Sequence, residues 1–521
     1  MARGEKLSKD AGAKKPRISE LMEAILEDVI KAGKMPSAEW RALSSSPFVP
    51  LAIPLTEGGH YPVTQVGVNA AHELTRQTWV TREDLRQTIE RSVFDKLSFQ
   101  ALGETIRTSP GHLPQEAKQE QVHAPLGDEF YSALAADYLD NLDRLADRSR
   151  PDVDRHIPCH LFHADQLVQA FAVGPVMFRP REIWLDNFVT NSKERELIRE
   201  VEVGDKNLDV LLSERMVPDS DQCASTALNV LRSLRNYSWV ATVRMEGHEL
   251  TQSHLKASII IGLAIDVIGL LFHVQDARRF AKAGRQHMYG EDRLATSLDG
   301  RFMRGFSVQM PGLGGRPGDM ASKIKNDSHF LEAAGCILQH YVDGRRKGKA
   351  LHLVERWANA LYWVGEARRE ASDFMAVINY GCAVDGLSGA GGTAKEMIIL
   401  AEAALKSGED PTSEGMSIED AVTKVYLEGR NKLAHGEMSG LLEDLSEIRD
   451  IGEFLLSALF ETVTPVLADL LRSEPNITKI AEKHAYRLLR IKLQNASEQR
   501  KEDVQEDPGS DTTGESEMEK G

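Results

Sequence analysis

Cysteine is scarce in this chain of 521 residues, which contains only four. They are Cys159, Cys223, Cys336 and Cys382, and no two of them form a CxxC pair. This scarcity excludes a disulfide framework and is typical of proteins in a reducing compartment. No apolar core of a secretory signal closely follows the basic residues near the N-terminus. We therefore expect a cytoplasmic protein.

Positive charge is also in deficit. The chain has 63 lysines and arginines against 79 aspartates and glutamates, which gives a formal net charge of −16. A protein that coats nucleic acid non-specifically is normally basic, because its cations displace the counterions of the phosphate backbone. The charge balance therefore excludes a broad nucleic-acid-coating surface. It leaves room for a small local site that contacts nucleic acid.

A long apolar run without charge is missing as well. The strongest candidate is ASIIIGLAIDVIGLLFHV, residues 257–274, which has Asp266 in its middle and His273 near its end. The run is about long enough to span a bilayer. However, a carboxylate in the middle of a membrane is costly, so a buried helix explains the segment better. We expect no membrane partner.

The order of apolar patterns predicts a mostly α protein with an α+β middle region. Stretches rich in proline and glycine suggest where regions meet, and polar, charged ends predict disorder. The expected regions are a disordered N-terminus (1–17), a helical N-terminal region with a linker (18–150), an α+β middle domain (151–320), a helical domain (325–495) and a disordered acidic tail (496–521).

Local periodicity predicts individual elements within these regions. A TRED capping pattern starts one of the expected helices, and a Gly-Pro turn lies inside an expected strand–turn–strand. Helices are expected over 18–31, 81–97, 251–272, 329–344, 351–370, 373–389, 394–406 and about 441–471; the strand–turn–strand covers 166–178, and further strands cover 181–189 and 238–247.

Histidine-containing segments do not form a complete metal site. HELT occurs twice, but Arg76 and Gln252 stand where a zinc protease of the HExxH type has its second histidine. A further cluster would need another ligand from elsewhere in the chain, and bulky apolar residues interleave it. This cluster is His156, Cys159, His160 and His163. We expect no metal.

The segment GLSGAGGT, residues 386–393, has the glycine spacing of a phosphate-binding loop. It lacks the lysine that would follow the glycines and contact the phosphates. A turn that ends a helix is the better interpretation, and we expect no cofactor.

The most informative stretch is YLEGRNKLAHGE, residues 426–437. Asn431 and His435 are four residues apart and would share one face of an α-helix. Arg430 lies five residues before His435, about 140° around a straight helix. The side chains of Arg430 and His435 could converge only if Arg430 bends back at a helix start, or if two copies meet across a dimer axis.

Arginine grips a phosphate with a planar fork of donors, histidine transfers protons near neutral pH, and asparagine can orient either group. This trio suits RNA cleavage without a metal, in which the ribose 2′-hydroxyl attacks the neighbouring phosphate. Spacing alone favours a simpler explanation, an exposed amphipathic turn, because an arginine and a histidine five apart often occur by chance.

The helical context of this stretch resembles the HEPN superfamily, and its Apea-like branch in particular. The resemblance covers roughly residues 325–475 and is carried by LVERWANALYWVGEARRE, FMAVINYGCAVDGLSG, the glycine turn with AKEM, and VYLEGRNKLAHG. It implies a C-terminal antiparallel helical bundle that forms a homodimer and acts as a metal-independent endoribonuclease. Arg430, Asn431 and His435 match the catalytic signature. Many members act in phage defence or as toxins, which implies an RNA substrate and an antitoxin or regulatory partner.

The family often carries an acidic residue on the helix before the glycine turn. Asp385 falls at this position, where glutamate would be expected. Two interpretations stay open. A buried Asp385 could pair with Arg430 and fix its direction as a supporting residue, or Asp385 could be exposed at the helix end.

A non-catalytic HEPN module that senses a ligand or partner is the alternative function. The charges around the motif attract RNA poorly, because basic residues are outnumbered there. They are Lys424, Arg430 and Lys432 against Glu428, Glu437, Glu443 and Asp444.

Overall fold

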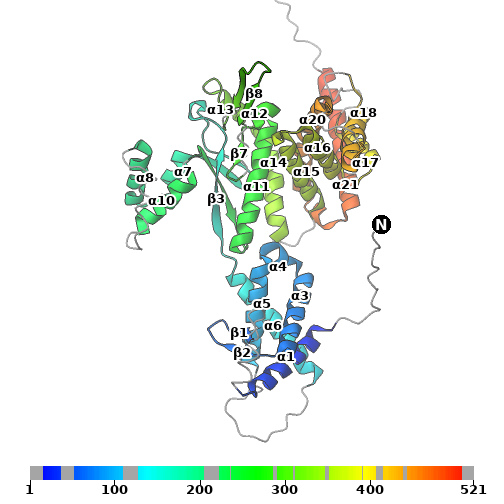
Figure 1. Ribbon diagram of the computed structural model, residues 1–521. Coiled ribbons are helices and arrows are strands. Elements are labelled where there is room, and N and C mark those ends of the chain that lie inside the picture. The colour runs from blue at the N-terminus through cyan, green and yellow to red at the C-terminus, as the bar shows by residue number, and fades with distance from the viewer. Residues whose placement is uncertain are drawn as a thin grey trace, which may run out of the picture. The chain divides into compact units, whose positions relative to one another are not determined.

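The computed structural model shown in Figure 1 describes most of the chain. The described residues are 16–36, 52–109, 127–204, 222–234, 236–284, 290–308, 311–346, 351–389, 391–405, 415–437 and 443–506. The fold is mostly helical with a small antiparallel sheet region in the middle, which confirms the expected fold class at this level. The chain divides into two compact units. The first comprises Met1–Val153 with Met245–Leu255, and the second comprises Asp154–Arg244 with Lys256–Gly521.

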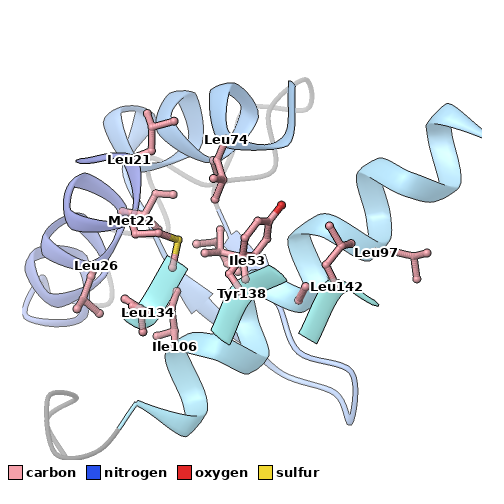
Figure 2. Close-up of a cluster of buried hydrophobic side chains, with 14 of the residues drawn as sticks. Leu21, Met22, Leu26, Ile53, Leu74, Leu97, Ile106, Leu134, Tyr138 and Leu142 are labelled. Carbon is pink, nitrogen blue, oxygen red and sulfur yellow. The ribbon is translucent and has the colours of Figure 1, made fainter. Parts of the chain in front are cut away.

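The first unit is a helical domain with a short hairpin. Apolar side chains from its helices meet in one core, in which Met22, Ile53 and Tyr138 are almost fully buried (Figure 2). The buried Asp28 carboxylate accepts hydrogen bonds from the backbone N–H and the hydroxyl of Thr64, at 2.6 and 2.5 Å. The elements are α1 (Ile18–Gly33), β1 (Ala52–Pro54), β2 (His60–Pro62), α3 (Gln65–Thr81), α4 (Glu83–Thr88), α5 (Arg91–Thr108) and α6 (Asp128–Arg148).

The prediction of a single helix over residues 81–97 is wrong. Thr81 ends α3 instead of capping a new helix, and the chain breaks again between α4 and α5. At the first break, Arg82 leaves helical geometry with φ −99° and ψ 75°. Its guanidinium lies 2.7 Å from the carboxylate of Asp84 and 2.6 Å from that of Asp143 on α6. A tertiary contact therefore fixes a bend that the apolar periodicity does not reveal.

The middle region contains a five-stranded sheet with the strand order β4-β5-β6-β3-β7. The expected strand–turn–strand is confirmed as β4 and β5, which pair antiparallel across a turn where Gly174 has φ 57°. The strand expected over 238–247 is confirmed as β6, which pairs antiparallel with β5. The strands are β3 (Val153–His160), β4 (Phe171–Val173), β5 (Val176–Pro180), β6 (Trp239–Met245) and β7 (Ala281–Lys282).

The strand expected over 181–189 is wrong, because these residues form α7 (Arg181–Phe188). Their aromatic and branched side chains favour a strand by composition. However, Pro180 ends β5 with φ −50°, a value compatible with a helix start. Trp184 and Leu185 of α7 then pack in a small apolar cluster with α8 (Ser192–Val203) and α10 (Gln222–Leu234).

The apolar helix expected over 251–272 is α11 (Leu250–Leu270). Its Asp266 lies 2.5 Å from Nη1 of Arg369, and both side chains are buried. Gly365 leaves the space for this carboxylate, since a Cβ there would lie 2.3 Å from an Asp266 oxygen. By length and composition, α11 and α20 (Ser446–Ser473) could each cross a membrane, and most of each apolar window is buried in the structure.

Short elements connect the sheet to the C-terminal helices. Lys282 of β7 donates a hydrogen bond to Ser258 of α11, so α11 lies beside the sheet (Figure 1). A separate two-stranded hairpin follows. The elements are η1 (Ala164–Gln166), α12 (Val274–Ala277), β8 (Gly290–Thr296), β9 (Phe302–Val308) and α13 (Asp319–Asn326).

The C-terminal region is helical, as expected. Trp357 is fully buried, and its Nε1 donates a hydrogen bond to Oγ1 of Thr464 at 3.0 Å, which joins α15 to α20. The elements are α14 (Ser328–Arg346), α15 (His352–Arg369), α16 (Asp373–Ser388), α17 (Ala394–Ala404), α18 (Ile418–Val422), η2 (Thr423–Asn431), α19 (Lys432–His435), α20, η3 (Ile477–Lys479) and α21 (Glu482–Glu506).

The structure differs from two predictions near the end of the chain: where the long helix begins, and where the disordered tail begins. The long helix begins at Ser446, and residues 441–442 lie outside the described residues. The tail expected to be disordered over 496–521 is helical as far as Glu506, because its first residues are mostly good helix formers. Residues 507–521 and 1–15 lie outside the described residues.

Candidate active site

The motif starts in an uncommon type of helix. Thr423–Asn431, the element η2, is a π-helix that continues directly into the short helix α19. Hydrogen bonds in a π-helix join residues five apart, so such residues lie one above the other. Tyr426 and Asn431 therefore share one face of η2. The prediction that the whole motif is α-helical is therefore wrong for the residues up to Asn431, which belong to the π-helix.

Two glycines bring η2 close to α16. A Cβ on Gly381 of α16 would lie only 2.3 Å from the Cβ of Arg430. A Cβ on Gly429 would lie 2.6 Å from Cγ1 of Val377. Both distances are shorter than side chains tolerate, so a larger residue at either position would push the two helices apart. This close packing accompanies the local change of helix type.

Arg430 is half-buried and has two neighbours on its own helix. Its Nη1 donates a hydrogen bond to Oδ1 of Asn431 at 2.8 Å. Its guanidinium carbon lies 5.5 Å from the centre of the Tyr426 ring, a distance at which a cation is attracted to an aromatic face. The structure thus brings Arg430 and Asn431 together, and it adds Tyr426 to them.

Tyr426 is 2% exposed. Burial raises the pKa of its hydroxyl, and the Asp385 carboxylate raises it further, whereas Arg430 and a hydrogen bond with Asn431 lower it. The hydroxyl therefore stays protonated at neutral pH. The hydroxyl can act as a fixed hydrogen-bonding partner of Asn431, while the ring contacts Arg430.

His435 follows this cluster by one short helix. It is the last residue of α19 and is exposed. Gly436 ends the helix in the left-handed conformation with φ 70°, and the N–H of Glu437 donates to the carbonyl of Lys432 at 2.9 Å. Within the described residues, no hydrogen bond joins His435 to Arg430 or Asn431. Its imidazole is accessible to a substrate or to a second chain.

Asp385 does not pair with Arg430 in the described part of the chain. Its half-buried carboxylate accepts a hydrogen bond from the N–H of Gly392 at 2.9 Å. A Cβ on Gly392 would lie 3.5 Å from the Tyr426 hydroxyl. Asp385 therefore fixes the glycine turn beside Tyr426, and the pairing with Arg430 that we considered is wrong.

The surface around the motif carries charges of both signs. Lys424 is held in an ion pair by Glu447 of α20. Glu428, Lys432 and Glu437 are exposed. The site therefore has no strong positive field, as the sequence suggested.

The cluster of three histidines and Cys159 considered above as a metal site lies on or just after β3. Its members contact other side chains there. Nδ1 of His156 lies 3.0 Å from Oγ1 of Thr242 and 3.1 Å from Nε1 of Trp184. Cys159 is fully buried, which raises the pKa of its thiol. In the part of the chain that the structure describes, no group of three or more His, Cys, Asp or Glu residues is arranged to hold a metal ion.

The other two motifs also have structural roles. The carboxylate of Glu249, in the second HELT, accepts hydrogen bonds from the N–H groups of Thr251 and Gln252 at 2.8 and 3.2 Å, so it caps the start of α11. The glycine segment ends α16, since Gly389 adopts the left-handed conformation with φ 63°. The expected helix-ending turn is confirmed.

Tyr426 was absent from the expected site residues. Its spacing of four before Arg430 is visible in the sequence, but the contact of its ring with the Arg430 guanidinium is seen only in the structure.

Comparisons of the chain with protein-family models, with curated proteins and with solved structures found no match.

Proposed function

We propose that the C-terminal helices form a HEPN-type bundle and that the chain is a metal-independent endoribonuclease, acting in phage defence or a toxin-like stress response. The observation that carries this proposal is the cluster of Arg430 and Asn431 over Tyr426, with the exposed His435 on the helix that follows. It supplies a phosphate-binding fork and a proton-transfer group within a few residues.

In the proposed reaction, the ribose 2′-hydroxyl attacks the adjacent phosphorus and the bond to the 5′-oxygen breaks. Arg430 stabilises the charge that develops on the phosphate oxygens, and Asn431 and Tyr426 hold Arg430 in place. His435 takes the proton from the 2′-hydroxyl or gives one to the leaving oxygen. The products are a 2′,3′-cyclic phosphate and a 5′-hydroxyl.

In the described part of the chain His435 makes no hydrogen bond to the Arg430 cluster, which supports a site completed by a second copy of the chain. A two-fold axis would place both motifs in one cleft, with each copy contributing to the other's site. Cleavage by a stable monomer would contradict this composite arrangement. Light scattering during an active assay shows whether the cleaving species is a monomer or a dimer.

The proposal is tested by replacing Arg430 and a neighbouring cation in parallel. Arg430→Ala is expected to abolish cleavage of RNA while circular dichroism stays unchanged. Lys432→Ala, which removes an exposed charge two residues away, is expected to keep most of the activity. Equal activity of both variants and the wild type would overturn the assigned role of Arg430.

A non-catalytic interaction module is the second candidate. The acidic residues exposed beside the motif favour it, since Glu428 and Glu437 repel a polyanion. This alternative predicts that the purified chain leaves RNA intact and that His435→Ala changes the binding of a partner protein.

A further inference from the structure

Positive charge gathers in one segment near the end of this acidic chain. Residues 475–497 contain five lysines and arginines and one glutamate, a net charge of +4, whereas the whole chain carries −16. Most of this segment is the first part of α21, which packs against α17 and α20 (Figure 1). The basic segment therefore belongs to the same helical region as Arg430.

Three of these cations form a strip along one side of α21. Lys483, Arg487 and Arg490 follow one another at intervals of four and three residues, the spacing at which side chains share one face of an α-helix. Lys483 and Arg487 are exposed, and neither forms an ion pair with any described residue. Arg490 is half-buried and lies 2.9 Å from the carboxylate of Glu396 on α17. We call these three side chains the basic strip.

The apolar side of α21 is already used for packing. Ala485, Leu489 and Leu493 are each at most 2% exposed. A helix that lies in a membrane surface needs such a side free to enter the lipid. Since this side of α21 is covered by protein, the basic strip suits a water-soluble polyanion and not a bilayer.

The glycine turn after α16 lies between α21 and the Arg430 motif. Tyr486 of α21 packs so closely on Gly389 that an added Cβ would lie 2.6 Å from its ring. Further along the turn, a Cβ on Gly392 would lie 3.5 Å from the Tyr426 hydroxyl. The turn therefore contacts α21 through one glycine and approaches the cluster of Tyr426 and Arg430 through another.

A fourth cation follows the turn directly. Lys395, in the first turn of α17, is exposed and forms no ion pair with any described residue. The carboxylates of Glu396 and Glu482, beside the basic strip, are engaged by Arg490 and Arg356. Positive charge therefore continues from the strip to the end of the glycine turn.

The Arg430 motif has no strong positive field of its own, so a nuclease built on it needs cations elsewhere to hold the substrate backbone. Residues four apart on a helix are separated by about 6 Å along its axis. Successive phosphates of an extended single strand have a similar separation. A strand that follows α21 can therefore place one phosphate at Lys483 and the next at Arg487.

We propose that the basic strip, together with Lys395, binds the phosphate backbone of single-stranded RNA and directs the strand across the glycine turn to Arg430. The inference rests on the proposed nuclease function and deepens it by naming the surface that holds the substrate. Lys483 and Arg487 bind RNA and take no part in the chemistry. Their loss raises KM and leaves kcat unchanged.

Fluorescence anisotropy of the full chain with a labelled single-stranded oligouridylate tests the proposal. Methylated 2′-hydroxyls keep this probe from being cleaved. Lys483→Gln and Arg487→Gln are each expected to weaken binding about fivefold and to reduce the slope of log affinity against log salt by about 0.7, the value for one phosphate contact on a single strand.

Lys492→Gln is the matched control. It removes the same charge from an exposed position on the same helix, about 140° around the axis from Arg487. Lys492 and His484 lie outside the basic strip. Lys492→Gln is therefore expected to bind the probe like the wild type, which separates a local contact from an effect of net charge.

The inference is overturned if the wild type does not bind the probe, if Lys483→Gln and Arg487→Gln bind it like the wild type, or if Lys492→Gln loses as much affinity as they do. Polyglutamate is expected to compete for the probe about tenfold less well than unlabelled oligouridylate, because its charges are spaced differently. Equal competition would assign the strip to acidic proteins instead.

Cleavage of unmodified RNA separates this inference from the proposed function. A chain that binds the probe through Lys483 and Arg487 but leaves RNA intact contradicts the nuclease function and supports the basic strip. Cleavage by Lys483→Gln and Arg487→Gln with the KM of the wild type contradicts the basic strip alone.

Discussion

Arg430 owes its direction to two neighbours outside the catalytic signature of Arg430, Asn431 and His435. The Tyr426 ring lies 5.5 Å from its guanidinium, and Gly381 leaves the space for its first side-chain carbons. The residue types of the site could be found from the sequence, since arginine, asparagine and histidine suggest phosphate chemistry. Their arrangement could not, because it depends on a π-helix and on the close approach of Gly381 to Arg430, which no pattern in the sequence indicates.

The substitution Gly381→Ala tests this close contact. The added Cβ would lie 2.3 Å from the Cβ of Arg430, an atom that cannot move without its backbone. We expect a loss of about 1–3 kcal/mol in the free energy of unfolding from overpacking. Denaturant unfolding measures this loss, and RNA cleavage should fall with it as Arg430 is displaced.

Gly386→Ala, five residues further along α16, is the matched control. A Cβ there would lie 3.8 Å from its nearest neighbours, the atoms of Ala360. Because alanine favours a helix over glycine, a gain of about 0.5–1 kcal/mol is expected. If Gly381→Ala behaved like this control, Gly381 would not direct Arg430.

Helix α20 fixes its neighbours through a buried polar network. The Glu453 carboxylate accepts hydrogen bonds from Arg368 of α15, Tyr380 of α16 and Ser457 of its own helix. Arg368 also donates from Nη1 to the carbonyl of Gly269 on α11 at 2.6 Å. Four helices therefore depend on one carboxylate and one guanidinium.

This network predicts a pH dependence of stability. Burial alone would raise the pKa of Glu453, but Arg368 and the hydrogen bonds outweigh it, so the pKa is lowered. A carboxyl group with a lowered folded-state pKa stabilises the fold above its unfolded value of about 4.3. This contribution is lost as the pH falls from there through the folded-state pKa.

Glu453→Gln is expected to lower the free energy of unfolding by about 3 kcal/mol at pH 7, because Arg368 loses its buried counter-charge. The difference from wild type should shrink below about pH 4, where the wild-type carboxyl group also becomes neutral. Urea unfolding at pH 7 and below about pH 4 measures the difference in the free energy of unfolding. Glu461→Gln, on an exposed position of α20, should change little at either pH. A difference for Glu453→Gln that stays constant with pH would contradict the account.

Elements with strong patterns could be predicted from the sequence, and elements set by neighbours could not. The apolar helix α11 and the β4–β5 hairpin were visible in periodicity and in a Gly-Pro turn. The segment of α7 has strand-like residues, but Pro180 and the cluster with α8 and α10 make it a helix. Arg82, at the break between α3 and α4, pairs with the carboxylates of Asp84 on α4 and Asp143 on α6.

Across the second unit, two glycines join the sheet to the C-terminal helices. Gly174, in the β4–β5 turn, meets Gly335 of α14 backbone to backbone. A Cβ on Gly335 would lie 2.3 Å from the backbone nitrogen of Gly174. Such an approach is possible only without side chains. The sequence contains both glycines, but nothing in it indicates that they meet.

Gly335→Ala is therefore expected to destabilise the second unit by about 1–3 kcal/mol or more, since neither backbone can yield easily. Thermal unfolding monitored by circular dichroism measures the effect. Gly269→Ala serves as the control, because its Cβ would make ordinary contacts, 3.6 Å or longer. A wild-type melting temperature for Gly335→Ala would show that the two parts do not meet at this point.

The charge of the whole chain, −16, argues against a broad RNA-binding surface, so any RNA contact has to be local. The proposed nuclease site is thus small, local and dependent on the exposed His435. Its central claim is that this histidine transfers the proton in RNA cleavage.

The most direct test compares RNA cleavage by the wild type, His435→Ala and His484→Ala in the presence of EDTA, with analysis of the product ends. His484 is an exposed histidine on α21 and serves as the matched control. We predict 2′,3′-cyclic phosphate ends from the wild type and from His484→Ala, and no cleavage by His435→Ala. Equal cleavage by His435→Ala would contradict the assigned role of His435, and RNA left intact by the wild type would favour the interaction module instead.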